Sequence, residues 1–248
     1  MAKTRLDVAL VERGLAETRA AAQRLVMAGL VFSGERRLDK PGHAIAGDTP
    51  IEVRGQPHPY VSRGGLKLEK GLDHFAIPVT DRIALDVGAS TGGFTDLLLQ
   101  RGAARVYAID VGTNQLAWKL RSDPRVLSME KTNIRDVTRK EVPEPIDLIV
   151  CDASFIGLRT ALPAALVLAA PGAHLVALIK PQFEVGKGRV GKGGIVREPE
   201  LHEEVCATIS DWVAAQPGWR VVGITESPIE GAEGNKEFLI AAHLSPRA

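Results

Sequence analysis

The chain has 248 residues, 45% of them hydrophobic and 25% charged, an ordinary composition for a globular protein that buries a full core. Because its formal net charge is +1, any nucleic-acid surface has to come from local clustering of the 31 basic residues. The two cysteines and six histidines show no metal-ligand spacing, so we expect no metal site and a reduced, cytoplasmic setting.

The first sixty residues predict a small α+β module. Thr4 can cap a first helix and Thr18 a second one, because a threonine hydroxyl can accept a hydrogen bond from a free backbone N–H at a helix start. Short strands are expected at residues 30–32 and 51–53, each next to a glycine-containing turn. A module of this size is near the lower limit for folding alone.

Basic residues are frequent on the polar face of this module, and by themselves they fit a solvated surface as well as an RNA-binding one. The order R-L-D-x-x-L-x-x-x-G, T-R-x-x-A-x-x-L-V-x-x-G-x-V, K-P-G and G-D resembles the alpha-L RNA-binding domain, a module named after a small-subunit ribosomal protein. The resemblance implies contacts with the phosphates of structured RNA. The residues in this module that it assigns to RNA are Arg5, Arg19, Gln23, Arg24, Arg36 and Arg37.

A short, stiff linker is expected at residues 54–60, RGQPHPY, because they contain two prolines and a glycine. The predicted domains are therefore the RNA-binding domain at residues 1–58 and a larger domain at residues 59–248.

An amphipathic helix is expected at residues 61–75, with Ser62 as its N-cap. The apolar stripe of this helix leaves Lys67, Lys70 and His74 together on its polar face.

The most informative stretch is IALDVGASTGGFTD at residues 83–96, which predicts a buried strand, a tight glycine turn and the start of a helix. Asp86 stands near the end of the strand, where ligands of open α/β sheets collect. The turn does not match G-x-G-x-x-G, which disfavours NAD, and Phe94 stands where a phosphate-binding loop needs lysine, which disfavours ATP. A ligand without phosphates remains, with a glycine turn kept only for packing as the alternative.

This loop resembles the S-adenosylmethionine loop of Rossmann-like methyltransferases. More narrowly, it resembles that of FtsJ-like ribose 2′-O-methyltransferases and of the TlyA group of ribosomal RNA methyltransferases, which are also called haemolysins. The resemblance implies an α/β fold, with a Rossmann-like methyltransferase sheet preceded by a small α+β RNA-binding domain, and S-adenosyl-L-methionine as cofactor. The residues assigned to the cofactor are Asp86, Gly88, Ser90, Gly92, Gly93, Phe94, Asp110 and Asp136.

Apolar runs after the loop alternate with helical patterns in the manner of a parallel sheet. Asp110 follows the next strand about twenty residues beyond the glycine turn, where a carboxylate can accept hydrogen bonds from ribose hydroxyls. By the family resemblance, Asp136 contacts the adenine. The strands are expected at residues 106–109, 126–129, 146–151, 175–179, 221–224 and 238–242.

Asp152, Lys180 and Glu237 lie next to ends of predicted strands, where a charged group needs a partner or water. Ordinary ion pairs are the alternative reading. However, four short strings resemble the segments that carry the catalytic Lys-Asp-Lys-Glu tetrad of the FtsJ-like and TlyA enzymes. In chain order they are SRGGLKL, CDAS, IKPQFE and NKEF. By this resemblance, the first lysine of the tetrad is Lys67. Lys180 is then the general base or the group that stabilises the oxyanion, and the two carboxylates orient the lysines and the ribose.

A cationic, glycine-rich loop is expected at residues 184–194, EVGKGRVGKGG. It fails as a phosphate-binding loop because Gly193 follows Lys192 where Ser or Thr is needed. We expect it to order on RNA, and a disordered surface loop is the alternative. The residues outside the first module that are assigned to RNA are Arg63, Lys187, Arg189 and Lys192.

No membrane segment is expected, because residues 1–14 lack the apolar core of a signal peptide and the most apolar stretch, 161–170, is short and contains Pro163. The predicted function is therefore S-adenosylmethionine-dependent 2′-O-methylation of cytidine in ribosomal RNA of the large subunit, with the small subunit left open. Ribosomal RNA or ribosomal subunits are the expected partners. The alternatives are a non-catalytic ribosome-assembly factor and a haemolysin or other membrane-active protein.

Overall fold

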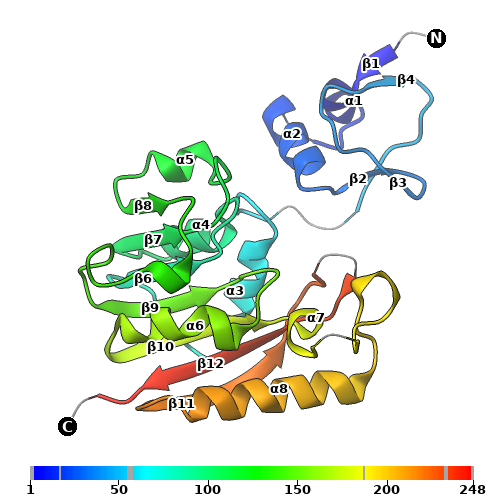
Figure 1. The fold of residues 1–248 in the computed structure, drawn as a ribbon. Helices are drawn as coiled ribbons and strands as arrows, with labels where there is room; N and C mark the ends of the chain where they lie inside the picture. Colours follow the sequence, from blue (N-terminus) through cyan, green and yellow to red (C-terminus); the bar gives the residue numbers. More distant parts are fainter. Residues whose placement is uncertain (1–2, 17, 55–57, 187, 232–233, 247–248) are drawn as a thin grey trace. The chain divides into compact units, whose positions relative to one another are not determined.

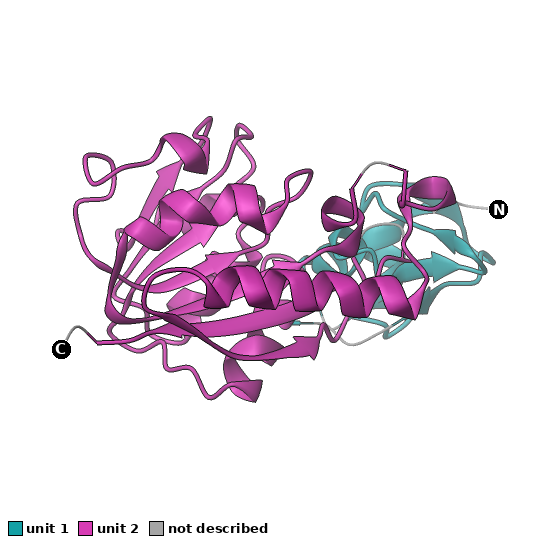
Figure 2. Ribbon diagram, turned by 60° about the horizontal axis from the view of Figure 1, so that its bottom comes forward, with its two compact units in different colours: residues 1–59 teal, residues 60–248 magenta. Residues whose placement is uncertain are grey.

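The computed structural model describes residues 3–16, 18–54, 58–186, 188–231 and 234–246. The chain divides into two compact units, which we call unit 1 (residues 1–59) and unit 2 (residues 60–248) (Figure 2). Each unit has hydrophobic core residues of its own.

Unit 1 is built from two helices and short antiparallel strands (Figure 1). In one sheet β1 pairs with β4, and in the other β2 lies between β3 and β5. The strands expected at residues 30–32 and 51–53 are confirmed, the first displaced by one residue and the second one residue shorter, whereas β1, β3 and β4 were not predicted. The elements are β1 (Lys3–Arg5), α1 (Leu6–Glu12), α2 (Arg19–Met27), β2 (Val31–Ser33), β3 (Arg36–Arg37), β4 (Ala44–Ala46) and β5 (Glu52–Val53).

The two predicted helix caps of unit 1 have different outcomes. Thr18 is confirmed as the N-cap of α2, since its hydroxyl accepts a hydrogen bond from the Ala21 N–H at 3.1 Å. The prediction for Thr4 is wrong: this residue lies in β1 opposite Ile45, and the N-cap of α1 is Arg5, whose side chain makes no capping bond. Pairing with β4 holds Thr4 in an extended conformation.

A fully buried carboxylate, that of Asp7, connects the two helices of unit 1. Arg5 donates to it twice at 3.0 Å, and Arg19 and Gln23 of α2 each donate at 2.9 Å. The hydrogen bonds, chiefly from Arg5, hold the pKa of Asp7 well below its ordinary value. Two of the arginines assigned to RNA are therefore already paired with an internal carboxylate.

We expect Asp7→Asn to destabilise unit 1 by about 1–2 kcal/mol, because charge-assisted bonds are lost but the arginine partners are half-exposed. Since the folded pKa of Asp7 is lowered, this contribution is complete above the ordinary aspartate pKa of about 4 and fades as pH falls below it. Hydrogen exchange of α1 and α2 at neutral pH measures the loss, with the exposed Asp39→Asn as control. Equal protection in wild type and Asp7→Asn would contradict it.

Unit 2 is organised around a seven-stranded sheet in the order β11-β12-β10-β9-β6-β7-β8. The strands β6 to β10 are parallel to one another, whereas β12 runs antiparallel to both β10 and β11. The expected α/β sheet is confirmed, and the last three strands are longer than predicted. The strands are β6 (Ile83–Val87), β7 (Arg105–Ile109), β8 (Val126–Met129), β9 (Ile146–Cys151), β10 (Ala169–Ile179), β11 (Trp219–Glu226) and β12 (Phe238–Leu244).

Helices cover both faces of this sheet (Figure 1). Alternate strand residues point to opposite faces, so Leu85 of β6 packs in the core with α6 and α8, and Ala84 in the core with α3 and α4. The helices are α3 (Gly64–His74), α4 (Gly93–Gln100), α5 (Trp118–Arg121), α6 (Leu158–Val167), α7 (Pro181–Glu184) and α8 (Pro199–Ala214), with the short 3₁₀ turns η1 (Ile134–Asp136) and η2 (Lys192–Gly194).

Helix α3 differs from its predicted form in two ways. Its N-cap is Arg63, not Ser62, and the Arg63 side chain makes no capping bond. Lys67 is buried, whereas Lys70 and His74 are exposed as expected. The helical periodicity placed Lys67 on the solvent-exposed side of α3, because a local pattern does not show that the oppositely charged Glu237 is buried next to it.

In the part of the chain that the structure describes, every helix is too short or too polar to cross a membrane.

Candidate active site

A cavity of about 560 Å³ lies where β6, β9 and β10 end and β12 begins. Because these parallel strands all end at one edge and β12 runs the opposite way, residues far apart in the sequence meet there. The strand order reverses between β6 and β9, a position at which open α/β sheets bind ligands. The topology therefore puts a ligand site at this edge of the sheet.

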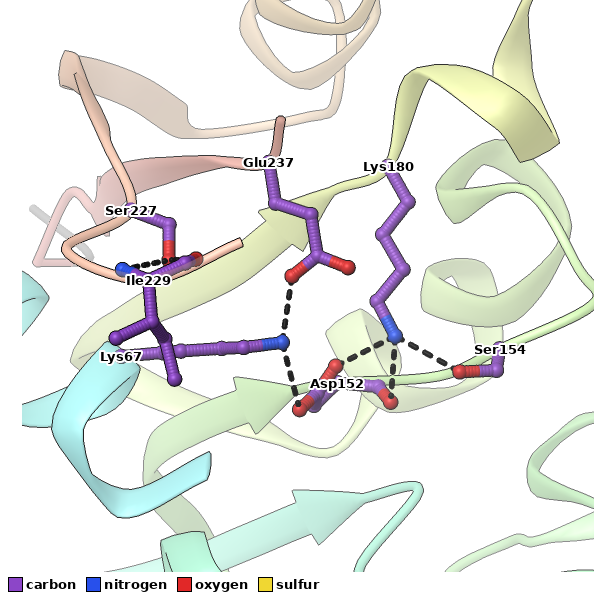
Figure 3. A network of polar contacts seen from close by, with 7 residues as sticks. All are labelled: Lys67, Asp152, Ser154, Lys180, Ser227, Ile229 and Glu237. Atoms are coloured by element: carbon purple, nitrogen blue, oxygen red, sulfur yellow. Dashed lines mark hydrogen bonds and ion pairs between the residues drawn. The ribbon is translucent and has the colours of Figure 1, made fainter. Parts of the chain in front are cut away.

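Four of the charged side chains that line this cavity form a network of alternating sign (Figure 3). Lys67 donates to Glu237 at 2.5 Å, and its Nζ lies 3.9 Å from Asp152 Oδ2. Lys180 Nζ lies 2.6 Å from Asp152 Oδ1. Since Lys67, Lys180 and Glu237 are each at most 6% exposed, this is a nearly buried charge network and not a surface ion pair.

The ammonium group of Lys180 has three acceptors around it. Besides the Asp152 carboxylate, it donates to the Ser154 hydroxyl at 2.8 Å and to the Asp152 carbonyl at 3.4 Å. The contact with the carboxylate is an ion pair and the other two are hydrogen bonds, so hydrogen bonds use two of the three N–H bonds of the lysine ammonium. The group is thus fixed at the cavity wall, directly after the end of β10.

The glycine turn forms another part of the cavity wall, to which Gly88, Ser90, Gly93 and Phe94 contribute. Gly88 adopts a φ of +83°, and a Cβ there would lie 3.0 Å from the backbone of Asp152 and Ala153. A Cβ on Gly93 would overlap the Ser62 hydroxyl. The glycines therefore allow the turn to approach Asp152 and the segment before α3 closely, while Gly92 serves as the N-cap of α4.

Asp86 lies beneath the turn and does not line the cavity. It is fully buried in β6, and the Thr95 hydroxyl donates to it at 2.7 Å. Burial, with a smaller contribution from the charge of Asp152, raises the pKa of Asp86 to about 7. The geometry makes Asp86 a tie between the strand and α4, at the base of the turn.

The two carboxylates expected around the adenosine lie outside the cavity lining. Asp110 accepts hydrogen bonds from the Ser90 N–H at 2.7 Å and from the Gly112 N–H at 2.6 Å, so it connects the turn to the loop after β7. Asp136 is exposed at the end of η1.

The cations assigned to RNA differ in exposure and in pairing. Arg63 is exposed and lines the cavity, and Lys192 is exposed in η2. Arg189 is paired with Glu204 of α8 through contacts of 2.5 and 2.6 Å, so it is not free in the way a phosphate-following loop predicts. Lys187 lies outside the described residues. In unit 1 all five arginines assigned to RNA are exposed, and two of them, Arg5 and Arg19, are paired with Asp7.

Among the cavity-lining residues that were missed as site residues are Ser154, Phe155, Gln182 and Asn235. All but Phe155 lie inside the strings that suggested the tetrad, so the same strings could have indicated them. Asn235 is 2% exposed and holds the backbone of Gly194 and Val196 through bonds of 3.1 Å. Phe155 is 91% exposed with a φ of +66°, and no sequence pattern indicates such a residue.

Within the described residues, no group of three or more His, Cys, Asp or Glu side chains could hold a metal ion.

Comparisons with known proteins agree with this geometry. The family model described as FtsJ-like methyltransferase matches residues 60–244, and the S4 domain model matches residues 4–49. The chain is 46% identical to the 16S/23S rRNA (cytidine-2′-O)-methyltransferase TlyA of Mycobacterium tuberculosis, over 96% of this chain and 89% of that protein. It is 53% identical to YqxC of Bacillus subtilis, a candidate rRNA methyltransferase, over 97% and 86%. The solved structure of a candidate hemolysin from Streptococcus thermophilus has a TM-score of 0.77 at 48% identity, covering 99% of this chain and 90% of that one.

Proposed function

Because the chain belongs to the FtsJ-like methyltransferase family, we propose that it is an S-adenosylmethionine-dependent ribose 2′-O-methyltransferase acting on cytidine in ribosomal RNA. The observation that carries the proposal is the charge network of Lys67, Glu237, Asp152 and Lys180 in one cavity beside a glycine turn. As in the mycobacterial relative, RNA of the large and of the small subunit are the proposed substrates.

The residues at the cavity suit S-adenosylmethionine. A volume of about 560 Å³ falls within the usual range for small-molecule sites. The wall formed by residues 88–91 carries no basic side chain that would select phosphates. In the proposed arrangement this turn and Phe94 hold the cofactor, with Asp110 beside its ribose. When bound, the cofactor supplies a methyl group on a positively charged sulfur.

The charge network is suited to the other reactant, a ribose 2′-hydroxyl. The oxygen has to stand in line with the methyl group, so positioning supplies much of the acceleration. It also has to lose its proton, which goes to Lys180 where that residue acts as the general base and to solvent water where Lys180 stays charged. We assign to Lys180 the contact with this oxygen, because its ammonium is fixed at the cavity wall and can stabilise developing negative charge. Asp152 orients Lys180, and the Lys67 and Glu237 pair fixes Asp152 and the ribose from the other side.

Phe155 offers a place for the base of the target nucleotide. Its ring is exposed at the cavity next to Phe183, with ring centroids 5.4 Å apart. A left-handed backbone conformation is unfavourable for phenylalanine, and here it holds an apolar ring in water. Unstacked RNA bases commonly stack on exposed aromatic rings. We propose that the target base stacks on Phe155 while its ribose faces Lys180.

We expect Phe155→Ala to lower kcat/KM for RNA by about 5- to 150-fold, since stacking contributes about 1–3 kcal/mol per base. Phe155→Tyr keeps the ring and should stay near wild type, and the Kd for S-adenosylmethionine should be the same in all three proteins. Steady-state methylation of the RNA substrate measures the effect. An unchanged kcat/KM in Phe155→Ala would show that the target base does not stack on Phe155.

Residues 1–58, which are unit 1 without Pro59, are the proposed RNA-docking domain, and residues 59–248 are the proposed catalytic domain. The S4 domain match and the exposed Arg24, Arg36 and Arg37 support this assignment. Phosphate contacts of this kind give affinity without reading sequence. A ribosomal substrate also supports a cytoplasmic location.

The proposed function is tested by transfer of a labelled methyl group from S-adenosylmethionine to isolated ribosomal subunits and to intact ribosomes, with Lys180→Ala as control. Label at an alkali-resistant ribose in the RNA of each subunit, absent with the variant, is the expected result. Cofactor binding without transfer would favour a non-catalytic assembly factor. Lysis of lipid vesicles by the purified protein, without transfer, would favour the haemolysin alternative.

A further inference from the structure

The loop that follows β7 packs against the glycine turn. The Ala117 N–H donates to the Thr91 carbonyl at 3.1 Å, and Asp110 accepts from the Ser90 N–H at 2.7 Å. The side chains of Leu116 and Leu120 lie where a Cβ on Gly92 would stand. Since Ser90 and Thr91 line the cavity, the position of this loop decides the position of that wall.

The same loop is held from its other side by one carboxylate, Glu130, which directly follows β8. Glu130 accepts hydrogen bonds from the backbone N–H groups of Asn114 at 2.9 Å, Gln115 at 3.1 Å and Leu116 at 3.4 Å. Arg121 of α5 donates to it at 2.7 Å. These bonds, above all the one from Asn114, lower the pKa of Glu130, so the carboxylate is charged at neutral pH.

Residue 114 needs such support. Asn114 has a φ of +55°, a left-handed conformation that is uncommon for any residue other than glycine, although asparagine tolerates it best. Three successive N–H groups pointing at one carboxylate form a small anion-binding nest. Without Glu130 these groups would have to turn to water, and residues 114–116 would lose the contacts that hold them beside the end of β8.

We infer that Glu130 is a positioning residue of the cofactor site: it fixes residues 114–117, and through them the Ser90 and Thr91 wall against which S-adenosylmethionine binds. The inference rests on the proposed function. Glu130 does not line the cavity, so it acts only through this loop. Its effect should therefore appear in the affinity for the cofactor and not in the chemistry.

The experiment is titration of the full-length protein with S-adenosylmethionine and, separately, with S-adenosylhomocysteine in a calorimeter, comparing wild type with Glu130→Gln. The glutamine keeps the shape but presents an NH₂ group where a second acceptor oxygen stood. We expect Kd to rise about tenfold for both ligands, which corresponds to about 1.4 kcal/mol. At saturating cofactor, kcat and the KM for RNA should stay within about twofold of wild type.

Glu144→Gln is the matched control, because Glu144 also pairs with an arginine, Arg105 at 2.6 Å, but beside the opposite end of β7. Its cofactor Kd should equal that of wild type. Glu130→Asp keeps the charge on a shorter side chain that cannot reach all three N–H groups, and it should raise Kd as well.

A Kd unchanged in both Glu130 variants, or a fall in kcat with no change in Kd, would overturn the inference. So would an equal rise in the Glu144→Gln control. If the wild-type protein binds neither ligand, the proposed function fails and not merely the role of Glu130.

Discussion

Replacing Lys180 by alanine is expected to lower the rate of methyl transfer about 10²- to 10⁴-fold, the range typical of a positioned acid, base or charge-stabilising group. Lys180 is 6% exposed and is fixed by Asp152 and Ser154, whereas the other lysine of the network, Lys67, is paired with Glu237. The measurement is single-turnover transfer to ribosomal subunits with cofactor and enzyme in excess. The Kd for S-adenosylmethionine should stay within about threefold of wild type.

Two variants sharpen this result. Lys70→Ala removes an exposed lysine from α3, the helix that also carries Lys67, and should leave the rate unchanged. Lys180→Arg keeps a cation that does not act as a base at neutral pH. Partial activity in Lys180→Arg supports charge stabilisation, whereas loss as complete as in Lys180→Ala supports proton abstraction. Near wild-type turnover of Lys180→Ala would remove Lys180 from the mechanism.

The strands and the glycine turn could be predicted because each depends on a short, continuous pattern. The run from Ile83 into Gly88 shows a buried strand and a tight turn within a few residues. The prediction for Thr4 failed because a threonine before an apolar helix pattern suits a β-strand as well as an N-cap, and a partner strand is present here. That partner, β4, lies about forty residues further along the chain, and local patterns do not reveal such pairings.

The residues of the site likewise fall into those that the sequence indicated and those that only the structure shows. The resemblance of four short strings indicated Lys67, Asp152, Lys180 and Glu237, and the structure brings these four together. Periodicity alone placed Lys67 in solvent. Residues that act through backbone contacts have no such signal: Glu130 is one acidic residue among many in the sequence, and only the folded loop shows what its carboxylate holds.

The largest change in stability is expected from breaking the ion pair between Lys67 and Glu237. Both side chains are buried, at 6% and 2% exposure, and their charged atoms lie 2.5 Å apart. Lys67→Met leaves the Glu237 carboxylate buried without its cation, which we expect to destabilise unit 2 by about 3–5 kcal/mol. Urea unfolding followed by tryptophan fluorescence measures this, because Trp118, Trp212 and Trp219 are the three tryptophans of the chain and all lie in unit 2.

The double variant Lys67→Met/Glu237→Gln separates stability from activity. Neither residue of the pair is then charged, so we expect stability to return to within about 1–2 kcal/mol of wild type, since neutral replacement of a buried ion pair is often tolerated. Methyl transfer should nevertheless stay at least about 10²-fold below wild type, because the network that fixes Asp152 is gone. A double variant as unstable as Lys67→Met would mean that the pair supports the fold, whereas recovery of stability without activity assigns the buried pair to the reaction.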